Sequence, residues 1–287
     1  MALPCIPKAT VIPRLLHQVY VGSELPSILK KNIENLKALN PGWGHTLYDD
    51  AAIVRFISEH YGRDYLNYYF RINKEYGAAR SDFFRYLLMY RLGGVYLDVK
   101  SNVNRPLDEI ILPDDQYIIS QWKNEAGALH AGMGLQQELE HVPGGEFQQW
   151  YIITVPGHPF LRAVIEAVVD NIERYSVYSH KTARTGVFRT TGPIVYTKTI
   201  APLLHRFPCR IVDNETSLGL RYSMFDDKGA LAHVALGGTH YSELTTPVVS
   251  NTGVRLAIDL TYIGLRRRFR ALRSRLGQGT PMHGSSH

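Results

Sequence analysis

The chain has little cysteine, no long apolar run and no acidic residue near its C-terminus. Its two cysteines, Cys5 and Cys209, are too few for a disulfide framework, which is typical of a reducing compartment. No apolar stretch approaches the length of a bilayer span, so we expect no membrane-crossing helix. Residues 1–7 lack the basic start and long apolar core of a signal peptide. These absences predict a cytoplasmic location.

The composition indicates an ordinary globular protein with its basic charge in one place. The 287 residues are 45% hydrophobic and 20% charged, which suits one large domain, and the formal net charge is +6. From Thr261 onward there is no Asp, Glu or Lys, but there are six arginines. Without these six, the 32 basic residues fall to 26, equal to the 26 acidic ones. The neutral body excludes a nucleic-acid partner.

Strand and helix patterns alternate along the chain. We expect strands at 14–21, 45–48, 95–100, 116–122, 148–155, 210–213 and 231–236, and helices at 26–39, 51–61, 79–92, 159–175 and 197–207. The aromatic residues 65–70 fit either a helix or a lid. This alternation predicts an α/β fold with a mostly parallel sheet, in which ligands bind beyond the carboxyl ends of strands.

The run 79–100 is the most informative part of the sequence. It predicts a helix, a stop at Gly93-Gly94, and a strand that carries Asp98 near its end. Asp82 and Arg85 are three residues apart and so share one helix face. Along the strand, the polar side chains alternate with apolar ones and would point one way: Tyr96, Asp98 and Lys100. Charges brought to one spot by apolar elements indicate a binding or catalytic site.

This run resembles the signature of sugar transferases of glycosyltransferase family 32, which is related to the glucosyltransferase domain of large clostridial toxins. The family has an Ala-Asp…Arg helix, a Gly-Gly and an Asp-X-Asp strand end. Other stretches resemble family landmarks in the same order, so that the likeness spans residues 12 to 241: residues 12–22, Asn40-Pro41, residues 47–50, residues 156–160 and Thr191-Gly192-Pro193. The resemblance implies a GT-A fold, a Rossmann-like sheet flanked by helices.

The resemblance also implies an enzyme that transfers a hexose, with retention of configuration, from a UDP- or GDP-linked sugar to a glycan or glycolipid. Cell-surface polysaccharide synthesis is the expected setting. The implied donor-binding residues are Tyr20, which would stack on the base, and Asp82, Arg85, Tyr96 and Asp98. The expected catalytic residues are Asp98, Lys100 and His240, and the expected metal ligand is Asp98.

Each of these residues also has an ordinary structural interpretation. Tyr20 could be a plain strand tyrosine, and Asp82 with Arg85 a local ion pair on a helix. Tyr96 could belong to the core, and His240 could be a hydrogen-bonded loop histidine. The sequence leaves these alternatives open.

Lys100 departs from the family pattern. It stands where relatives carry the second aspartate, a direct ligand of a divalent cation such as Mn²⁺ or Mg²⁺, and an ammonium cannot be a ligand. Three interpretations follow: the metal persists through Asp98, the diphosphate and other side chains; Lys100 itself neutralises the diphosphate; or catalysis is lost. The last makes a non-catalytic nucleotide-sugar-binding relative the alternative function.

The C-terminal segment predicts a basic amphipathic helix. Its apolar residues step by four and three along one face, and arginines fill the others: Ile258, Tyr262, Leu265, Phe269, Leu272 and Leu276. Such a helix can lie on an anionic membrane surface, which would place the enzyme peripherally at the inner face. It could also dock on its own body or on a second subunit. We therefore expect a transferase domain over 1–255, this helix over 256–277 and a disordered tail over 278–287.

Overall fold

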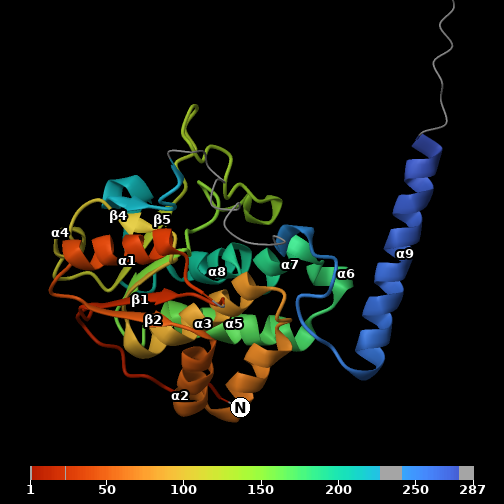
Figure 1. Cartoon of the computed structure of the whole chain (residues 1–287), viewed down its shortest axis with the longest axis horizontal. Helices are drawn as coiled ribbons and strands as arrows, with labels where there is room; N and C mark the ends of the chain where they lie inside the picture. Colours follow the sequence, from red (N-terminus) through yellow and green to blue (C-terminus); the bar gives the residue numbers. More distant parts are fainter. Residues whose placement is uncertain (1, 23, 227–240, 278–287) are drawn as a thin grey trace, which may run out of the picture.

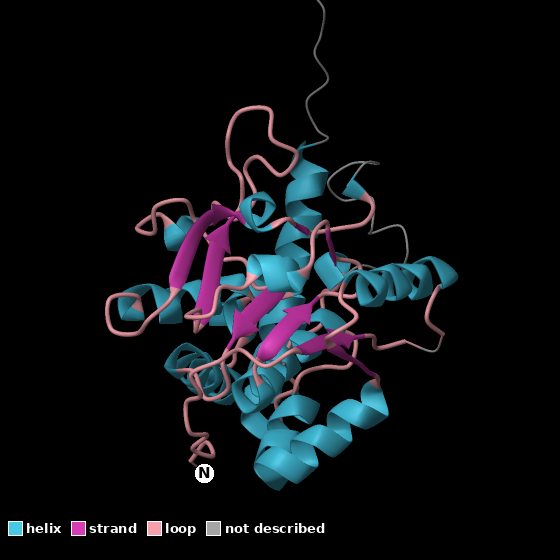
Figure 2. Cartoon of the chain, turned by 90° about the vertical axis from the view of Figure 1, so that its left-hand side faces the viewer, coloured by secondary structure: helices cyan, strands magenta, loops and turns pink. Residues whose placement is uncertain are grey.

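The computed structural model describes residues 2–22, 24–226 and 241–277, and it shows the predicted α/β architecture (Figure 1). Six strands form one sheet, and helices lie on both of its sides (Figure 2). A second sheet has two strands, β4 (Asn102–Val103) and β8 (Leu220–Arg221).

The strands are β1 (Leu15–Val19), β2 (Gly44–Tyr48), β3 (Gly94–Leu97), β4 (Asn102–Val103), β5 (Tyr117–Gln121), β6 (Tyr151–Thr154), β7 (Arg210–Asn214) and β8 (Leu220–Arg221). The helices are α1 (Ser27–Leu39), α2 (Asp50–Arg71), α3 (Gly77–Leu92), α4 (Leu107–Ile110), α5 (Pro159–Arg174), α6 (Val177–His180), α7 (Ala183–Thr190), α8 (Pro193–Ile200) and α9 (Gly253–Gly277). Short 3₁₀ turns occupy Gln137–Leu139, Ala201–Leu203, Glu215–Leu218 and Tyr241–Glu243.

The main sheet has the strand order β2-β1-β3-β6-β5-β7. β1 pairs in parallel with both β2 and β3, and β5 pairs in parallel with β7. β6 runs antiparallel to its two neighbours, β3 and β5. The sheet is therefore mixed but mostly parallel, as the alternating pattern predicts.

Each face of the sheet supports its own apolar core. On one face, side chains such as Tyr96 and Ile152 pack with α2, α3, α5 and α8. On the other face, Val95, Leu97 and Ile153 pack with residues of α1 and α4. The sheet is thus covered on both sides, which is typical of parallel strands.

Two glycines let α3 pass directly into β3. Gly93 has φ 63° and Gly94 has φ 92°, a region that other residues rarely adopt. A Cβ atom on Gly94 would lie 2.4 Å from the carbonyl oxygen of Leu15, on the neighbouring strand. This tight connection fixes the distance between the polar residues of α3 and the end of β3.

Several predicted elements have different bounds in the structure. The strand expected at 95–100 ends at Leu97, and Asp98 and Lys100 lie in a turn, where the amide of Ser101 donates to the carbonyl of Asp98. The strand is therefore shorter than predicted, with Tyr96 on it and Asp98 and Lys100 after it, although the Tyr96 hydroxyl still donates to Asp98. Residues 65–70 belong to α2, which bends at Gly62.

The C-terminal part of the predicted pattern also differs in detail. The helix expected at 197–207 corresponds to α8, which begins and ends earlier and is followed by a 3₁₀ turn. The strand expected at 231–236 lies outside the described residues. No helix among the described residues is long and apolar enough to cross a membrane.

Candidate functional site

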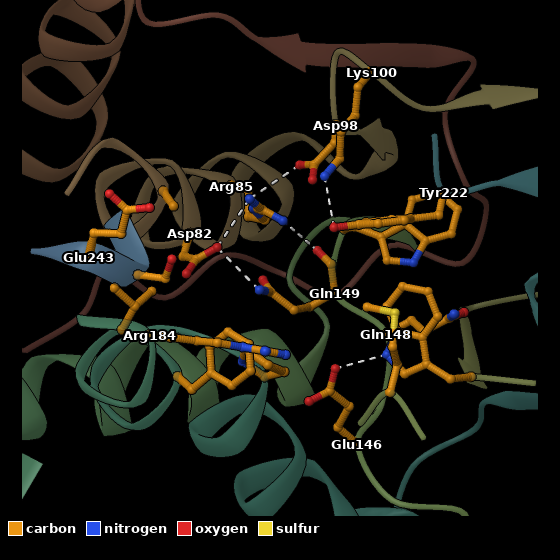
Figure 3. A pocket seen from close by; sticks show the side chains of 18 residues that line it. Asp82, Arg85, Asp98, Lys100, Glu146, Gln148, Gln149, Arg184, Tyr222 and Glu243 are labelled. Carbon is orange, nitrogen blue, oxygen red and sulfur yellow. Dashed lines mark hydrogen bonds and ion pairs between the residues drawn. The ribbon is translucent and has the colours of Figure 1, made fainter. Parts of the chain in front are cut away.

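A cavity of about 380 Å³ lies where β3 ends, between α3, α7 and the chain that leads into β6 (Figure 3). This volume is within the range of small-molecule sites, roughly 300–1,000 Å³. Its lining combines charged side chains from α3 and the turn after β3 with aromatic rings: Asp82, Arg85, Asp98, Lys100, Trp150 and Tyr222. The cavity is therefore a candidate site for a polar ligand with an apolar or aromatic part.

Arg85 is the centre of a buried ion network. One guanidinium nitrogen lies 3.1 Å from a carboxylate oxygen of Asp82 and 3.3 Å from one of Asp98. A second nitrogen donates to the carbonyl of Gln149 at 2.7 Å. The guanidinium carbon lies 4.8 Å from the centre of the Tyr96 ring. Arg85 thus joins α3, the end of β3 and the segment before β6.

Asp82 is held by three kinds of donor but remains costly to ionise. Besides Arg85, its oxygens accept from the amide of Gln149 at 3.2 Å and the hydroxyl of Thr191 at 3.1 Å. Burial is the largest influence and raises its pKa to about 6, against the lowering effect of Arg85, while Asp98 adds a smaller rise. At neutral pH Asp82 is therefore mostly an anion in the cavity wall.

The turn that carries Asp98 is fixed by backbone contacts. The amide of Asp98 donates to the carbonyl of Trp150 at 2.9 Å. The side-chain amide of Asn32, on α1, donates to the carbonyls of Val99 and Ser101. The Asp98 side chain remains 22% exposed, while those of Asp82 and Arg85 are 5% exposed. Of these three residues, Asp98 offers the most surface to a ligand.

Lys100 lies at the aromatic end of the cavity. Its ammonium donates to the Tyr222 hydroxyl at 2.8 Å and lies 4.0 Å from the centre of that ring. Burial lowers the pKa of Lys100 to about 8, and the field of Asp98 partly opposes this effect. The Tyr222 ring in turn packs edge-on against Trp122 and Trp150. Contacts with Tyr222 therefore hold the Lys100 ammonium in the cavity that Asp98 also lines.

The described residues do not form a complete protein site for a divalent cation at Asp98. Mn²⁺ and Mg²⁺ prefer several oxygen ligands, and carboxylates are the usual protein donors. Within residues 2–22, 24–226 and 241–277, no cluster of three or more His, Cys, Asp or Glu side chains could hold a metal ion. The position of the expected second carboxylate is taken by the ammonium of Lys100.

The structure brings four of the predicted residues together around the cavity: Asp82, Arg85, Asp98 and Lys100. Tyr96 lies behind them with its ring 1% exposed, and its hydroxyl donates to Asp98 at 3.1 Å. Its contacts are those of a positioning residue, so it has no ring surface for the direct donor contact expected of it. Tyr20 is not among the lining residues, and its hydroxyl donates to the carbonyl of Glu24. His240 lies outside the described residues.

The cavity also contains residues that the sequence interpretation did not single out: Trp122, Glu146, Gln149, Trp150, Arg184 and Tyr222. Trp122 directly follows β5, so the rule on carboxyl strand ends could have indicated it. Gln149 and Trp150 precede β6, whose place beside β3 follows from no local pattern. Arg184 and Tyr222 are distant in sequence from the central run.

Two polar atoms in the cavity wall are buried without a partner among the described residues. They are Nε1 of Trp150, a donor, and Oε2 of Glu146, an acceptor. The other oxygen of Glu146 accepts from the indole of Trp122 at 2.8 Å, and burial raises the pKa of Glu146. Unpartnered buried groups of this kind are costly, so Trp150 and Glu146 each have one hydrogen-bonding atom that is not used within the protein.

A second cavity, of about 330 Å³, lies behind Tyr222. His130 lies there between Glu215, at 3.8 Å, and Asp226, at 3.6 Å. Burial would lower the pKa of His130, but the charges of these carboxylates raise it to about 9. At these distances the contacts are ion pairs, and Nε2 of His130 has no hydrogen-bond partner among the described residues. The His130 ring also packs edge-on against Tyr222, so this cluster supports the aromatic wall of the first cavity.

One protein-family model and several curated proteins are similar to this chain. Residues 26–118 match the family model of the glycosyltransferase sugar-binding region containing a DXD motif, which confirms the resemblance to glycosyltransferase family 32. The chain is 24% identical to an inositol phosphoceramide mannosyltransferase of Schizosaccharomyces pombe over 64% of its own length and 49% of that protein. It is 26% identical to an initiation-specific alpha-1,6-mannosyltransferase of Candida albicans, over 56% and 44% respectively. The chain thus spans about half the length of these curated relatives.

Solved structures share the fold. The UDP-bound glycosyltransferase domain of the YGT toxin superposes with a TM-score of 0.54 at 10% identity, over 77% of this chain and 83% of that one. The PaToxG glycosyltransferase gives a TM-score of 0.50 at 16% identity, over 68% and 71%. The predicted GT-A fold is therefore confirmed.

The His130 cluster makes stability depend on pH in a defined window. Because the pKa of His130 is raised from 6.5 to about 9 by folding, its contribution is fully present below pH 6.5 and is lost as pH rises to about 9. We predict that His130→Gln lowers the free energy of unfolding at pH 6.5 by roughly 1–2 kcal/mol, and that the difference from wild type shrinks by pH 9.5. Urea unfolding across this range measures it.

The exposed His141 provides the control, since His141→Gln should follow the wild-type curve at every pH. A constant difference between His130→Gln and wild type from pH 6.5 to 9.5 would show that the ion pairs do not carry the effect.

Proposed function

From the match of residues 26–118 to a DXD-containing sugar-binding region, we propose that the chain is a glycosyltransferase that uses a nucleotide-diphosphate sugar. The observation that carries the proposal is the Asp82–Arg85–Asp98 network at the cavity beyond β3. It stands at the end of a strand in a GT-A sheet, where ligands of such sheets bind.

The cavity suits the parts of such a donor. Carboxylates such as Asp98, and the unpartnered Glu146 oxygen, can accept from sugar hydroxyls. The ammonium of Lys100 and the guanidinium of Arg184 can meet the diphosphate charge. The aromatic wall can cover the apolar face of a sugar ring. Each chemical part of the donor therefore has a matching group in the lining.

The proposed reaction moves the sugar from phosphate to a hydroxyl. The bond between the sugar's anomeric carbon and the β-phosphate oxygen breaks, and its electron pair stays with the diphosphate. A hydroxyl oxygen of the acceptor forms the new bond on the same face, which retains configuration, and its proton leaves with the phosphate. Stabilising the developing diphosphate charge is then the main task of the site.

The acceptor we propose is a glycan or glycolipid, and mannose is the first sugar to test. The named relatives are mannosyltransferases, one of which acts, by its name, on inositol phosphoceramide. GDP-mannose and UDP-linked hexoses are therefore the donors with which to begin. The base-stacking role of Tyr20 and the contact of His240 with the diphosphate remain parts of this proposal.

We predict that the wild-type protein releases nucleoside diphosphate from one such donor and that Asp98→Asn lowers kcat/KM by about 100-fold or more, which corresponds to about 3 kcal/mol of lost transition-state stabilisation. Asp98→Asn keeps the shape of the side chain but removes the charge beside Arg85. A coupled assay of released UDP or GDP measures the rates, and the thermal midpoint checks folding.

Asp108→Asn is the matched control, because Asp108 pairs with Arg14 at the surface, far from the cavity lining. Equal rates for Asp98→Asn and wild type would refute the proposed site. Donor binding without release, with any acceptor, would favour the alternative of a non-catalytic nucleotide-sugar-binding relative.

We also propose that α9 binds an anionic membrane surface, where a lipid-linked acceptor would lie. Its first turns are attached to the body: Asp259 is buried and accepts from the backbone amide of Val177, and Tyr262 packs against Tyr178. The rest of α9 stands apart from the body in Figure 1. Attachment at one end leaves most of the helix surface available.

The helix α9 exposes apolar side chains, and its charged residues after Thr261 are all arginines. Val254 is 76% exposed and Ile258 is 57% exposed, and both line a shallow groove with Leu265. The six arginines from Arg266 to Arg275 have no acidic residue beside them in sequence. A basic helix with an apolar face suits an anionic lipid surface better than a neutral partner. The division of the chain into a domain over 1–255 and this helix belongs to the same proposal.

We predict that replacing Arg266, Arg267 and Arg268 by Gln lowers partitioning onto phosphatidylserine vesicles by roughly 100-fold, since each basic residue near the surface contributes about 1 kcal/mol. Vesicle sedimentation measures the bound fraction. The control removes three exposed arginines of the body, in the variant Arg55→Gln, Arg63→Gln and Arg206→Gln. Equal losses in the two triple variants, or binding to neutral vesicles alone, would contradict the proposal.

A further inference from the structure

We propose that Lys100, and not a divalent cation, neutralises the diphosphate of the donor in this protein. The inference rests on the proposed function and adds to it, because the resemblance implies a cation at this point of the site. If the Lys100 ammonium takes the place of the cation, binding of the donor does not depend on a metal ion.

The position of Lys100 is set by the structure and not only by the sequence. The turn that follows β3 is held on one side by Asn32 and on the other by the carbonyl of Trp150. The ammonium is then fixed by the Tyr222 hydroxyl at 2.8 Å and lines the same cavity as Asp98. Figure 3 shows the Lys100 and Asp98 side chains next to each other. Lys100 is therefore ordered in the site before any ligand binds.

Lys100 supplies positive charge at the place beside Asp98 where the family resemblance implies a divalent cation. The family pattern has an aspartate, with one negative charge, at the position where this chain has Lys100, with one positive charge. The replacement adds two positive charges to the site, which equals the charge of Mg²⁺ or Mn²⁺. The cavity lining has four carboxylates, Asp82, Asp98, Glu146 and Glu243, and three cations, Arg85, Lys100 and Arg184. Arg85 is already shared between Asp82 and Asp98, so Lys100 is the cation beside Asp98 that can act on the ligand. A divalent ion added to this set would meet the repulsion of Lys100 at short range.

The donor capacity of Lys100 supports the same role. An ammonium has three N–H donors, and among the contacts of the described residues Tyr222 accepts one of them. The other two can donate to oxygens of a diphosphate, as lysines do in other phosphate sites. When the bond to the anomeric carbon breaks, the electron pair goes to the phosphate oxygen, and the ammonium stabilises the charge without giving up its proton.

Binding of UDP and GDP to the full chain tests the inference. Calorimetric titrations are run in excess chelator and again with added Mn²⁺, and the fluorescence of Trp122 and Trp150, which line the cavity, gives a second readout. For the nucleotide that binds, we expect the same Kd in both conditions. Lys100→Met should weaken binding by roughly 10- to 100-fold, as for other hydrogen bonds to charged groups, and Lys100→Arg should restore part of it.

The variant Lys100→Asp distinguishes a site that uses a lysine from a site that uses a divalent cation. It recreates the second aspartate, so it should bind weakly in chelator and gain affinity with Mn²⁺. Lys74→Met removes a lysine that is exposed and lines neither cavity, and it should match the wild type. The thermal midpoint of each variant shows whether it is folded.

The outcomes distinguish the inference from the proposed function. Wild-type binding that is lost in chelator and restored by Mn²⁺ would overturn the inference and leave the proposed function intact. Equal Kd values for Lys100→Met and wild type would also overturn it. No binding of either nucleotide in any condition would overturn the proposed function together with the inference.

Discussion

A buried guanidinium shared by two carboxylates is the interaction on which the site depends. Arg85 comes from the middle of α3, where nearly every neighbouring side chain is buried. Breaking such a network by removing one partner typically costs 3–5 kcal/mol, because the remaining charges lose their compensation. Arg85 therefore fixes Asp82 and Asp98 relative to each other, and the short Gly93-Gly94 link keeps the two elements that carry them in register.

The same network explains why Lys100 has a separate role. Arg85 is used by its carboxylates, by the Gln149 carbonyl and by the Tyr96 ring. It therefore has little capacity for a ligand. Lys100 has a phenol hydroxyl and an aromatic face as its contacts, and these hold the ammonium without cancelling its charge. These two cations thus have different roles: Arg85 builds the cavity wall, and Lys100 can meet a substrate.

The sequence indicated the parts of the site that are local and missed those that depend on strand order. Asp82, Arg85, Asp98 and Lys100 lie within nineteen residues on one helix–strand unit, so helical spacing and the strand-end rule bring them together. The α/β class followed from the same periodicity. Gln149, Trp150, Arg184 and Tyr222 reach the cavity because β6 lies antiparallel beside β3 and because α7 and β8 fold back over it. No local pattern specifies those long-range pairings.

Local patterns were also least reliable at the ends of elements. The alternation of polar and apolar residues continues past Leu97, but a hydrogen-bonded turn ends β3 there. Tyr96, for which the sequence left donor binding and a core position open, is buried and supports Asp98 and Arg85. Tertiary contacts from α1 and from the segment before β6 hold the turn that ends the strand.

A crystal structure of the protein with the nucleotide sugar it binds, grown without added metal, tests the central claim most directly. The account predicts a donor in the cavity, with a diphosphate oxygen in hydrogen-bond contact with the Lys100 ammonium and the sugar beside Asp82 and Asp98. A donor bound elsewhere, or a cation bridging Asp98 and the phosphates with Lys100 turned away, would contradict it.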